Sequence, residues 1–179
     1  MTRLILIYGA IAGLIVAVPM IVLMLTLTGD TAPENGALYG YLTMIVALTM
    51  VFLGIKHYRD KMLGGVIRFW PALAVGLAIS AVAGVIYVIG WEISLALTGF
   101  DFGEAMSKMM LDAARARGAT ETELQNVAGE AADFARMYEN ALYRLPITFV
   151  EIFPIGMLIS LVSAGLLRNS RFLPARARG

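Results

Sequence analysis

The chain has 179 residues, of which 59% are hydrophobic and 15% charged, with a formal net charge of +1 and a mean hydropathy of +0.78. A water-soluble domain keeps a largely polar surface, so this composition excludes one and predicts an integral membrane protein. The absence of cysteine excludes disulfides, thiolate catalysis and cysteine metal ligands, and the single histidine, His57, excludes a multi-histidine centre. We therefore expect no metal and no cofactor.

Four apolar segments are long enough to cross ~30 Å of hydrocarbon as helices. In chain order they are residues 4–28, 38–55, 71–97 and 146–167. The first is longer than the roughly 7–15 apolar residues of a signal peptide and has no small-x-small cleavage site after it, which predicts a retained span. We expect Pro71 and Pro146 in the first turn of their helices, and Pro19 and Pro154 inside theirs, where proline kinks a helix.

The basic side chains predict the orientation of these spans. They precede the first span, lie between the second and third, and follow the fourth: Arg3, Lys56, Arg59, Lys61, Arg68, Arg168, Arg171, Arg176 and Arg178. The segment after the first span holds Asp30 and Glu34 without a basic residue, and residues 100–145 are acidic on balance. Positive charge stays cytoplasmic, so both termini are expected in the cytoplasm and residues 100–145 outside.

Residues 100–145 contain two predicted helices. The first has apolar side chains at helical spacing: Phe102, Met106, Met109, Met110 and Ala113. The second opens at Thr120, which with Glu123 fits a capping box, and its apolar positions alternate by three and four: Leu124, Val127, Ala131, Phe134, Tyr138, Ala141 and Leu145. Such stripes usually pack on each other, here as a helical hairpin. A dimerisation or partner-docking face and a lipid-surface contact around Met109 are the alternatives.

Small residues recur at spacing four in three of the spans. The rows are Gly9, Gly13 and Ala17; Ala72, Gly76, Ser80 and Gly84; and Gly156, Ser160 and Ala164. Rows of this kind let membrane helices approach closely. The sequence therefore predicts an all-α fold: one membrane domain over residues 1–179, a four-helix bundle with an extracytoplasmic helical hairpin between spans three and four.

Two carboxylates lie inside the predicted spans, Glu92 and Glu151. A charge in hydrocarbon is costly unless it is paired or solvated, so both are candidates for a functional site. Each is expected roughly 8 Å inside the outer boundary. Glu92 continues the small-residue row of its span and should face the interior, whereas the direction of Glu151 is not predicted beside Pro154.

Three interpretations of the two carboxylates remain open. They make structural bonds, with Arg144, Tyr143, Tyr87 or backbone freed by Pro154 as partners. They form a cation or proton site in an outward cavity. They are acid and base groups of a lipid-active membrane enzyme. Because no nucleophile, metal-ligand cluster or phosphate loop accompanies them, we predict no catalytic residue.

The loop between spans two and three is the second candidate site. Lys56, Arg59, Lys61 and Arg68 suit anionic lipid head groups, at ~1 kcal/mol for each basic residue. Asp60 is expected to pair with Lys56 one turn back or to stabilise a turn before Gly64-Gly65. Arg59-Asp60 is also a candidate partner-binding pair. The basic residues are too few and too scattered for nucleic acid.

The same loop carries a family resemblance. The stretch reads Gly54-Ile55-Lys56-His57-Tyr58-Arg59-Asp60-Lys61, then Gly64-Gly65 and Ile67-x-Phe69. Further matching features are Tyr8-Gly9, Ala12-Gly13-Leu14, Ile86-Tyr87-Val88-Ile89 before Trp91-Glu92, Glu151-Ile152 and Pro154-x-Gly156. Over essentially its whole length the chain resembles a bacterial membrane family known as domain of unknown function 4199. The resemblance implies a four-span bacterial inner-membrane protein and no activity. His57 stands where the family pattern has an amide.

These observations favour a non-enzymatic inner-membrane scaffold or accessory protein. It is expected to act through a homo-oligomer or a membrane-protein partner, with lipids as its other contacts. The first alternative is a small transporter or ion-binding protein that uses Glu92 and Glu151. The second is a membrane enzyme acting on lipid.

Overall fold

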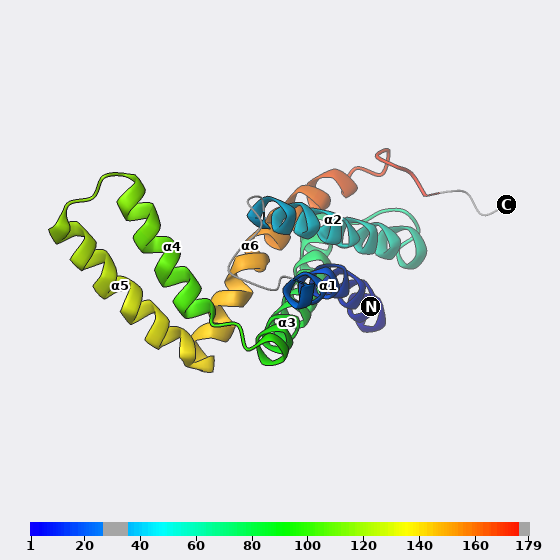
Figure 1. Cartoon of the computed structure of the whole chain (residues 1–179). Coiled ribbons are helices and arrows are strands. Elements are labelled where there is room, and N and C mark those ends of the chain that lie inside the picture. The colour runs from blue at the N-terminus through cyan, green and yellow to red at the C-terminus, as the bar shows by residue number, and fades with distance from the viewer. Residues whose placement is uncertain (27–35, 176–179) are drawn as a thin grey trace.

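The computed structural model describes residues 1–26 and 36–175. Within them the chain forms six α-helices: α1 (Thr2–Thr26), α2 (Gly36–His57), α3 (Phe69–Thr98), α4 (Phe102–Ala116), α5 (Glu121–Glu139) and α6 (Ala141–Leu167) (Figure 1). A π-helical turn, η1 (Tyr58–Met62), continues α2. The predicted all-α fold, with a helix pair between the third and fourth long apolar helices, is confirmed.

Four helical segments are long and apolar enough to cross a membrane, and they indicate a multi-pass membrane protein. They are α1, α2 with η1, α3 and α6. Pro19 lies inside α1, and Pro154 inside α6. Some residues used for the predicted ends and orientation of the spans lie outside the described residues: 27–28, Asp30, Glu34, Arg176 and Arg178.

The start of α6 differs from the prediction. The helix begins at Ala141, so Pro146 lies inside it rather than in its first turn. The cause is Asn140, whose side-chain oxygen accepts a hydrogen bond from the backbone N–H of Leu142 at 3.0 Å. Such a cap satisfies a free N–H and starts the helix ahead of the proline. The last residues of the predicted excursion, 141–145, therefore belong to α6.

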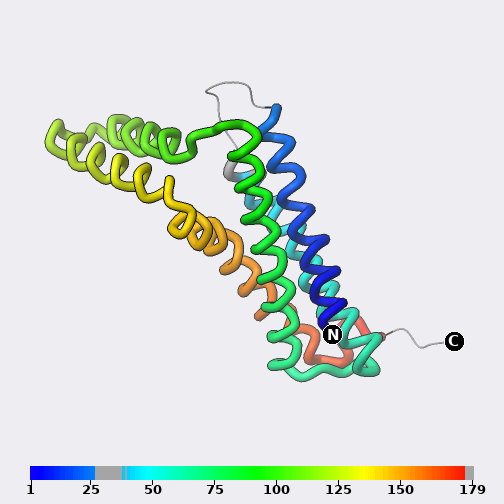
Figure 2. The backbone as a smooth tube through the Cα atoms, turned by 90° about the horizontal axis from the view of Figure 1, so that it is seen from below, coloured from blue at the N-terminus to red at the C-terminus, as the bar shows by residue number. Residues whose placement is uncertain are grey.

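The four long helices form a ring in which α3 packs on α1 and α6, and α2 packs on the same two helices. The interior is filled by large apolar side chains that are completely or almost completely buried, among them Leu48, Val51, Ile55, Ile79, Ile152 and Leu167. Figure 2 shows the N-terminus, the turn after α2 and the end of α6 together at one end of the bundle. We call this the loop end, and the opposite end the arm end.

The crossing of α3 and α6 depends on small side chains on both helices. A Cβ at Gly76 would lie 2.8 Å from the Cβ of Ser160, and a Cβ at Gly156 would lie 2.7 Å from the Cβ of Ser80. The two serine hydroxyls are 3.3 Å apart and buried. The predicted rows on these spans thus face each other, and the absence of a side chain at each glycine lets the backbones approach.

Helices α4 and α5 form a pair that we call the arm, residues 102–139. Gly103 packs directly against Ala135, and the Ser107 hydroxyl donates to the carbonyl of Ala131 at 2.9 Å. The predicted capping box at Thr120 and Glu123 is confirmed. The hydrogen bond from the Thr120 backbone N–H holds the pKa of the Glu123 carboxyl below its usual value. The arm projects sideways from the bundle (Figures 1 and 2).

Candidate functional site

Glu92 and Arg144 form a bidentate ion pair between α3 and α6 at the arm end. Arg144 Nε lies 2.7 Å from Glu92 Oε1, and Nη2 lies 2.6 Å from Oε2. The remaining guanidinium nitrogen, Nη1, donates to the carbonyl of Tyr138 at 3.1 Å. The Arg144 guanidinium carbon also lies 5.7 Å from the centre of the Tyr138 ring. A bidentate arginine–carboxylate pair is stronger than a single hydrogen bond and fixes the relative orientation of the two side chains. Together with the bond to Tyr138, it makes Arg144 the link between α3, α5 and α6.

Aromatic side chains brace the base of the arm next to this ion pair. Trp91 Nε1 donates to the Tyr138 hydroxyl at 2.8 Å. Phe102 packs against both rings, with centroids 5.3 Å from Trp91 and 4.8 Å from Tyr138. Tyr138 is 5% exposed, and its burial raises the pKa of its hydroxyl. The arm is therefore attached to the bundle by a packed, hydrogen-bonded joint.

An open cleft of about 470 Å³ lies over this joint. Its walls come from the end of α3, the turn into α4, the end of α5 and the start of α6: Glu92, Leu95, Ala96, Gly99, Phe100, Asp101, Phe102, Gly103, Ala135, Tyr138, Glu139 and Arg144. Both Glu92 oxygens in this cleft are bonded to Arg144. In the part of the chain that the structure describes, no three His, Asp or Glu side chains are grouped to hold a metal.

Glu151 has a separate partner. The Tyr87 hydroxyl donates to Glu151 Oε2 at 3.2 Å, and Tyr87 is only 5% exposed, whereas Glu151 is exposed on the surface of α6. The predicted equal depth of the two glutamates is wrong. Tyr87 precedes Glu92 by five residues on α3, so Glu151 lies about 7 Å further from the arm end. The depth of Glu151 was predicted by counting residues from a helix that begins at Pro146. Because α6 begins five residues earlier, at Ala141, Glu151 lies further along the helix than predicted.

At the loop end, Arg59 has no exposed surface. Its Nη1 donates to the carbonyl of Phe172 at 2.9 Å and its Nη2 to that of Leu173 at 2.5 Å, with the Leu167 carbonyl at 3.5 Å from Nη1. Its Nε lies 2.6 Å from Asp60 Oδ1. A side chain this enclosed is not available to another molecule. Arg59 holds the end of α6 and the segment after it against η1.

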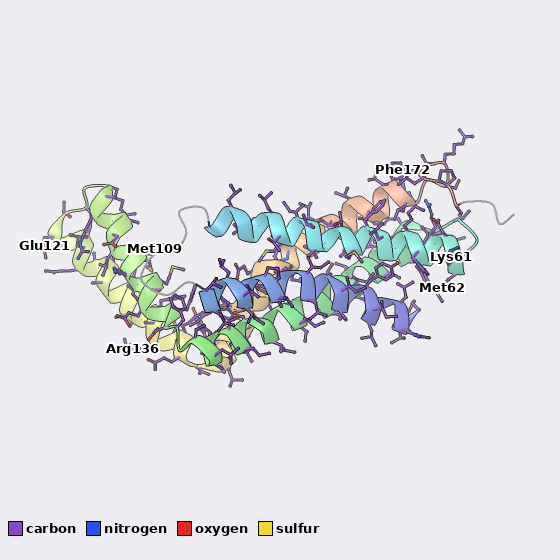
Figure 3. All side chains as sticks on the ribbon, turned by 45° about the vertical axis from the view of Figure 1, so that its right-hand side comes forward. Lys61, Met62, Met109, Glu121, Arg136 and Phe172 are labelled. Carbon is purple, nitrogen blue, oxygen red and sulfur yellow. The ribbon has the colours of Figure 1, made fainter. Side chains whose placement is uncertain are left out.

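The other predicted loop residues remain nearer the surface. Asp60 pairs with Lys56 at 2.5 Å, as expected from their spacing. Lys61 and Arg68 are exposed, and Figure 3 shows Lys61 at the outer edge of the loop end. After η1 the chain turns at Gly64 and Gly65, whose φ angles of 68° and 94° favour glycine.

His57, at the end of α2, is engaged with α1. The Tyr8 hydroxyl and His57 Nδ1 lie 3.2 Å apart, and the two rings meet edge to face. This contact joins the start of the chain to the distinctive loop motif.

We expect a double-mutant cycle on Glu92 and Arg144 to give a coupling energy of roughly 1–2 kcal/mol. That is more than the 0.2–1 kcal/mol of exposed pairs, because the contact is bidentate and partly shielded from water. The variants are Glu92→Gln, Arg144→Gln and both together, measured by reversible unfolding in lipid discs.

The matched control is the exposed pair Asp133–Arg136 on the arm. The cycle Asp133→Asn and Arg136→Gln should show little coupling. Equal coupling in the two cycles would mean that the Glu92–Arg144 pair does not brace the arm.

Sequence reasoning missed two parts of these sites. One is the inward direction of Arg59, for which a basic loop next to a span gives no signal. The other is the Trp91–Tyr138 hydrogen bond. Its signal was present, because Tyr138 belongs to the predicted apolar stripe and buried tyrosine and tryptophan usually have polar partners.

The fold and these contacts define an all-α, multi-pass membrane protein with a braced helical arm between its third and fourth spans. The chain belongs to the family described as protein of unknown function (DUF4199), whose model matches residues 7–169. The comparison with curated proteins gave no match, and neither did the comparison with solved structures.

Proposed function

We propose that this protein is a non-enzymatic component of a membrane assembly, formed with further copies of itself or with another membrane protein. The observation that carries the proposal is the exposed residue Glu151, ten residues into a helix that is long and apolar enough to cross a membrane. Ionisable groups in spans almost always face a protein interior or a water-filled cavity. A second helix packed over Glu151 provides such an interior.

The surrounding face of α6 suits a helix contact. Ile147, Leu158 and Val162 lie on the same face as Glu151 at helical spacing and are exposed. Farther along this face, nothing lies within 4 Å of the position that a Cβ would take at Gly165. An apolar face with one carboxylate and one glycine is the kind of surface that membrane helices use to associate.

The other carboxylate supports a structural role. Glu92 is already bonded through both oxygens to Arg144, so a cation would have to displace the guanidinium to reach it. This pairing favours the scaffold over a transporter that uses Glu92 and Glu151 together.

We also propose that the protein resides in a bacterial inner membrane with its loop end in the cytoplasm. The support comes from charge: Arg3, Lys61, Arg68, Arg168 and Arg171 all belong to that end. Positive charge of this density normally stays on the cytoplasmic side, where it also attracts anionic head groups. The arm then lies on the opposite side.

The test is the subunit number of the cysteine-free chain in native-lipid discs, measured by single-molecule photobleaching, together with native mass spectrometry in mild detergent. We expect more than one copy, or a fixed membrane partner, for the unchanged protein. Glu151→Leu should weaken the association about tenfold or more, which corresponds to ~1.4 kcal/mol.

The matched control is Glu130→Leu, the same change on the exposed side of the arm, which should leave the association unchanged. A strictly monomeric protein without a partner would refute the proposal, as would a Glu151→Leu variant that associates normally. If Glu151→Gln instead changes proton or cation flux in proteoliposomes while association persists, the ion-binding alternative replaces it.

A further inference from the structure

The two helices of the arm differ in polarity. The sequence of α5 carries five acidic side chains against one arginine: Glu121, Glu123, Glu130, Asp133, Glu139 and Arg136. The sequence of α4 is balanced, with Glu104 and Asp112 against Lys108 and Arg115. An anionic lipid surface therefore repels α5 more strongly than α4.

Each helix of the arm leaves one large apolar side chain exposed, Met109 on α4 and Met137, which is 45% exposed, on α5. Met109 is 57% exposed, and Ala113 and Ala116 follow it at spacings of four and three on the same face and are exposed too. Figure 3 shows Met109 on the side of the arm that faces the spans, and Glu121 at the far end, away from the bundle. The exposed apolar side chain of α4 is thus turned toward the spans.

The position of the arm matches the edge of the lipid-facing surface. Figures 2 and 3 show the arm running across the direction of the spans at the arm end of the bundle, instead of extending their axes. Where it joins the bundle, Leu97 is 60% exposed at the end of α3 and Leu142 is 82% exposed at the start of α6. The exposed apolar surface of the spans therefore continues to the base of the arm.

We propose that the arm lies on the membrane surface with α4 against the lipid and α5 in water. Amphipathic helices bind membranes in this orientation, with the apolar side at the boundary between head groups and acyl chains. The joint of Glu92 with Arg144 and Trp91 with Tyr138 fixes the direction in which the arm leaves the bundle. Met109 is then the side chain that enters the lipid boundary.

Because the sequence contains no cysteine, a single cysteine can be introduced into the full chain and labelled to test the orientation of the arm. Met109→Cys and the matched Glu130→Cys on α5 are each labelled with a nitroxide in discs of phosphatidylethanolamine and phosphatidylglycerol. Collision rates with oxygen, which concentrates in lipid, and with a water-soluble nickel chelate give the depth of each label. Val46→Cys, on the exposed face of α2, is the reference for a label in hydrocarbon.

We expect the Met109 label to collide several-fold more with oxygen than with the chelate, and the Glu130 label to show the reverse. Lipids with nitroxide on the upper acyl chain should broaden the Met109 spectrum and leave that of Glu130 unchanged. Equal access of the chelate to both labels would overturn the proposal. So would spin–spin broadening at Met109 that grows with protein density, because a second copy would then cover α4.

This outcome is independent of the assembly proposed for Glu151. A monomer whose Met109 label lies in lipid would refute the assembly and support the arm. An oligomer whose Met109 label lies in water would do the opposite.

Discussion

Replacing Arg59 by alanine is expected to lower the free energy of unfolding by about 3–5 kcal/mol, the range for removing one partner of a buried charged network. The guanidinium is fully buried and donates to the carbonyls of Phe172 and Leu173 while pairing with Asp60. Without it, these carbonyls lose their donors and Asp60 keeps only Lys56. Unfolding in lipid discs measures the change.

The local consequence of the same variant is release of the segment after α6. Leu173 has a φ of 45°, which is unfavourable for a residue with a side chain, and its carbonyl is bonded to Arg59. Hydrogen exchange of residues 168–173 should therefore accelerate strongly in Arg59→Ala, and partly in Arg59→Lys, which keeps the charge but loses the planar fork.

The control for Arg59 is Lys61→Ala, which removes an exposed cation two residues away. It should change stability by less than about 0.5 kcal/mol. An Arg59→Ala protein with wild-type stability and slow exchange after α6 would show that the arginine does not hold this segment.

Arg59 also shows where prediction from sequence ends. Its position next to a span identified it as part of a basic loop, and the rule for basic loops concerns the side of the membrane, not the direction of a side chain. The carbonyls that it binds lie more than a hundred residues away in the chain. Only the packing of η1 against the end of α6 brings them together.

The hydrogen-bond partners of the two glutamates were easier to predict than those of Arg59, because the need of a carboxylate for a nearby donor is local. A carboxylate inside a span needs a donor, and Arg144 and Tyr87 were among the few donors in neighbouring segments. Which donor serves which carboxylate depends on the register of α3 against α6. That register is set by the packing of α3 on α6, where Gly76 meets Ser160 and Gly156 meets Ser80. Misplacing the start of α6 at Pro146 gave the wrong depth for Glu151.

The rows of small residues predicted close helix contacts, but not the helices that make them. Glycine and serine at spacing four indicate that a backbone can approach, and the same pattern serves any partner. In the structure the row containing Gly76 and Ser80 meets the row containing Gly156 and Ser160 in a reciprocal arrangement, glycine against serine on both sides. This reciprocity makes the crossing sensitive to a single added methyl group.

Gly156→Ala is expected to destabilise the bundle by about 1–3 kcal/mol, the usual cost of forcing extra volume into a packed core. The new Cβ would lie 2.7 Å from the Cβ of Ser80 and 2.8 Å from its hydroxyl oxygen, so α3 and α6 must move apart. This separation also lengthens the Ser80–Ser160 contact, which is already 3.3 Å. Thermal unfolding in discs, with cross-linking rates between the two helices, measures both effects.

Gly129→Ala is the matched control, because it makes the same change inside α5, away from the packed spans. Nothing lies within 4 Å of a Cβ at that position, so the variant should gain roughly 0.5–1 kcal/mol from the better helix propensity of alanine. The two variants should therefore shift stability in opposite directions. Equal shifts would mean that propensity alone governs both positions, and that the close approach of Gly156 to Ser80 contributes nothing to the bundle.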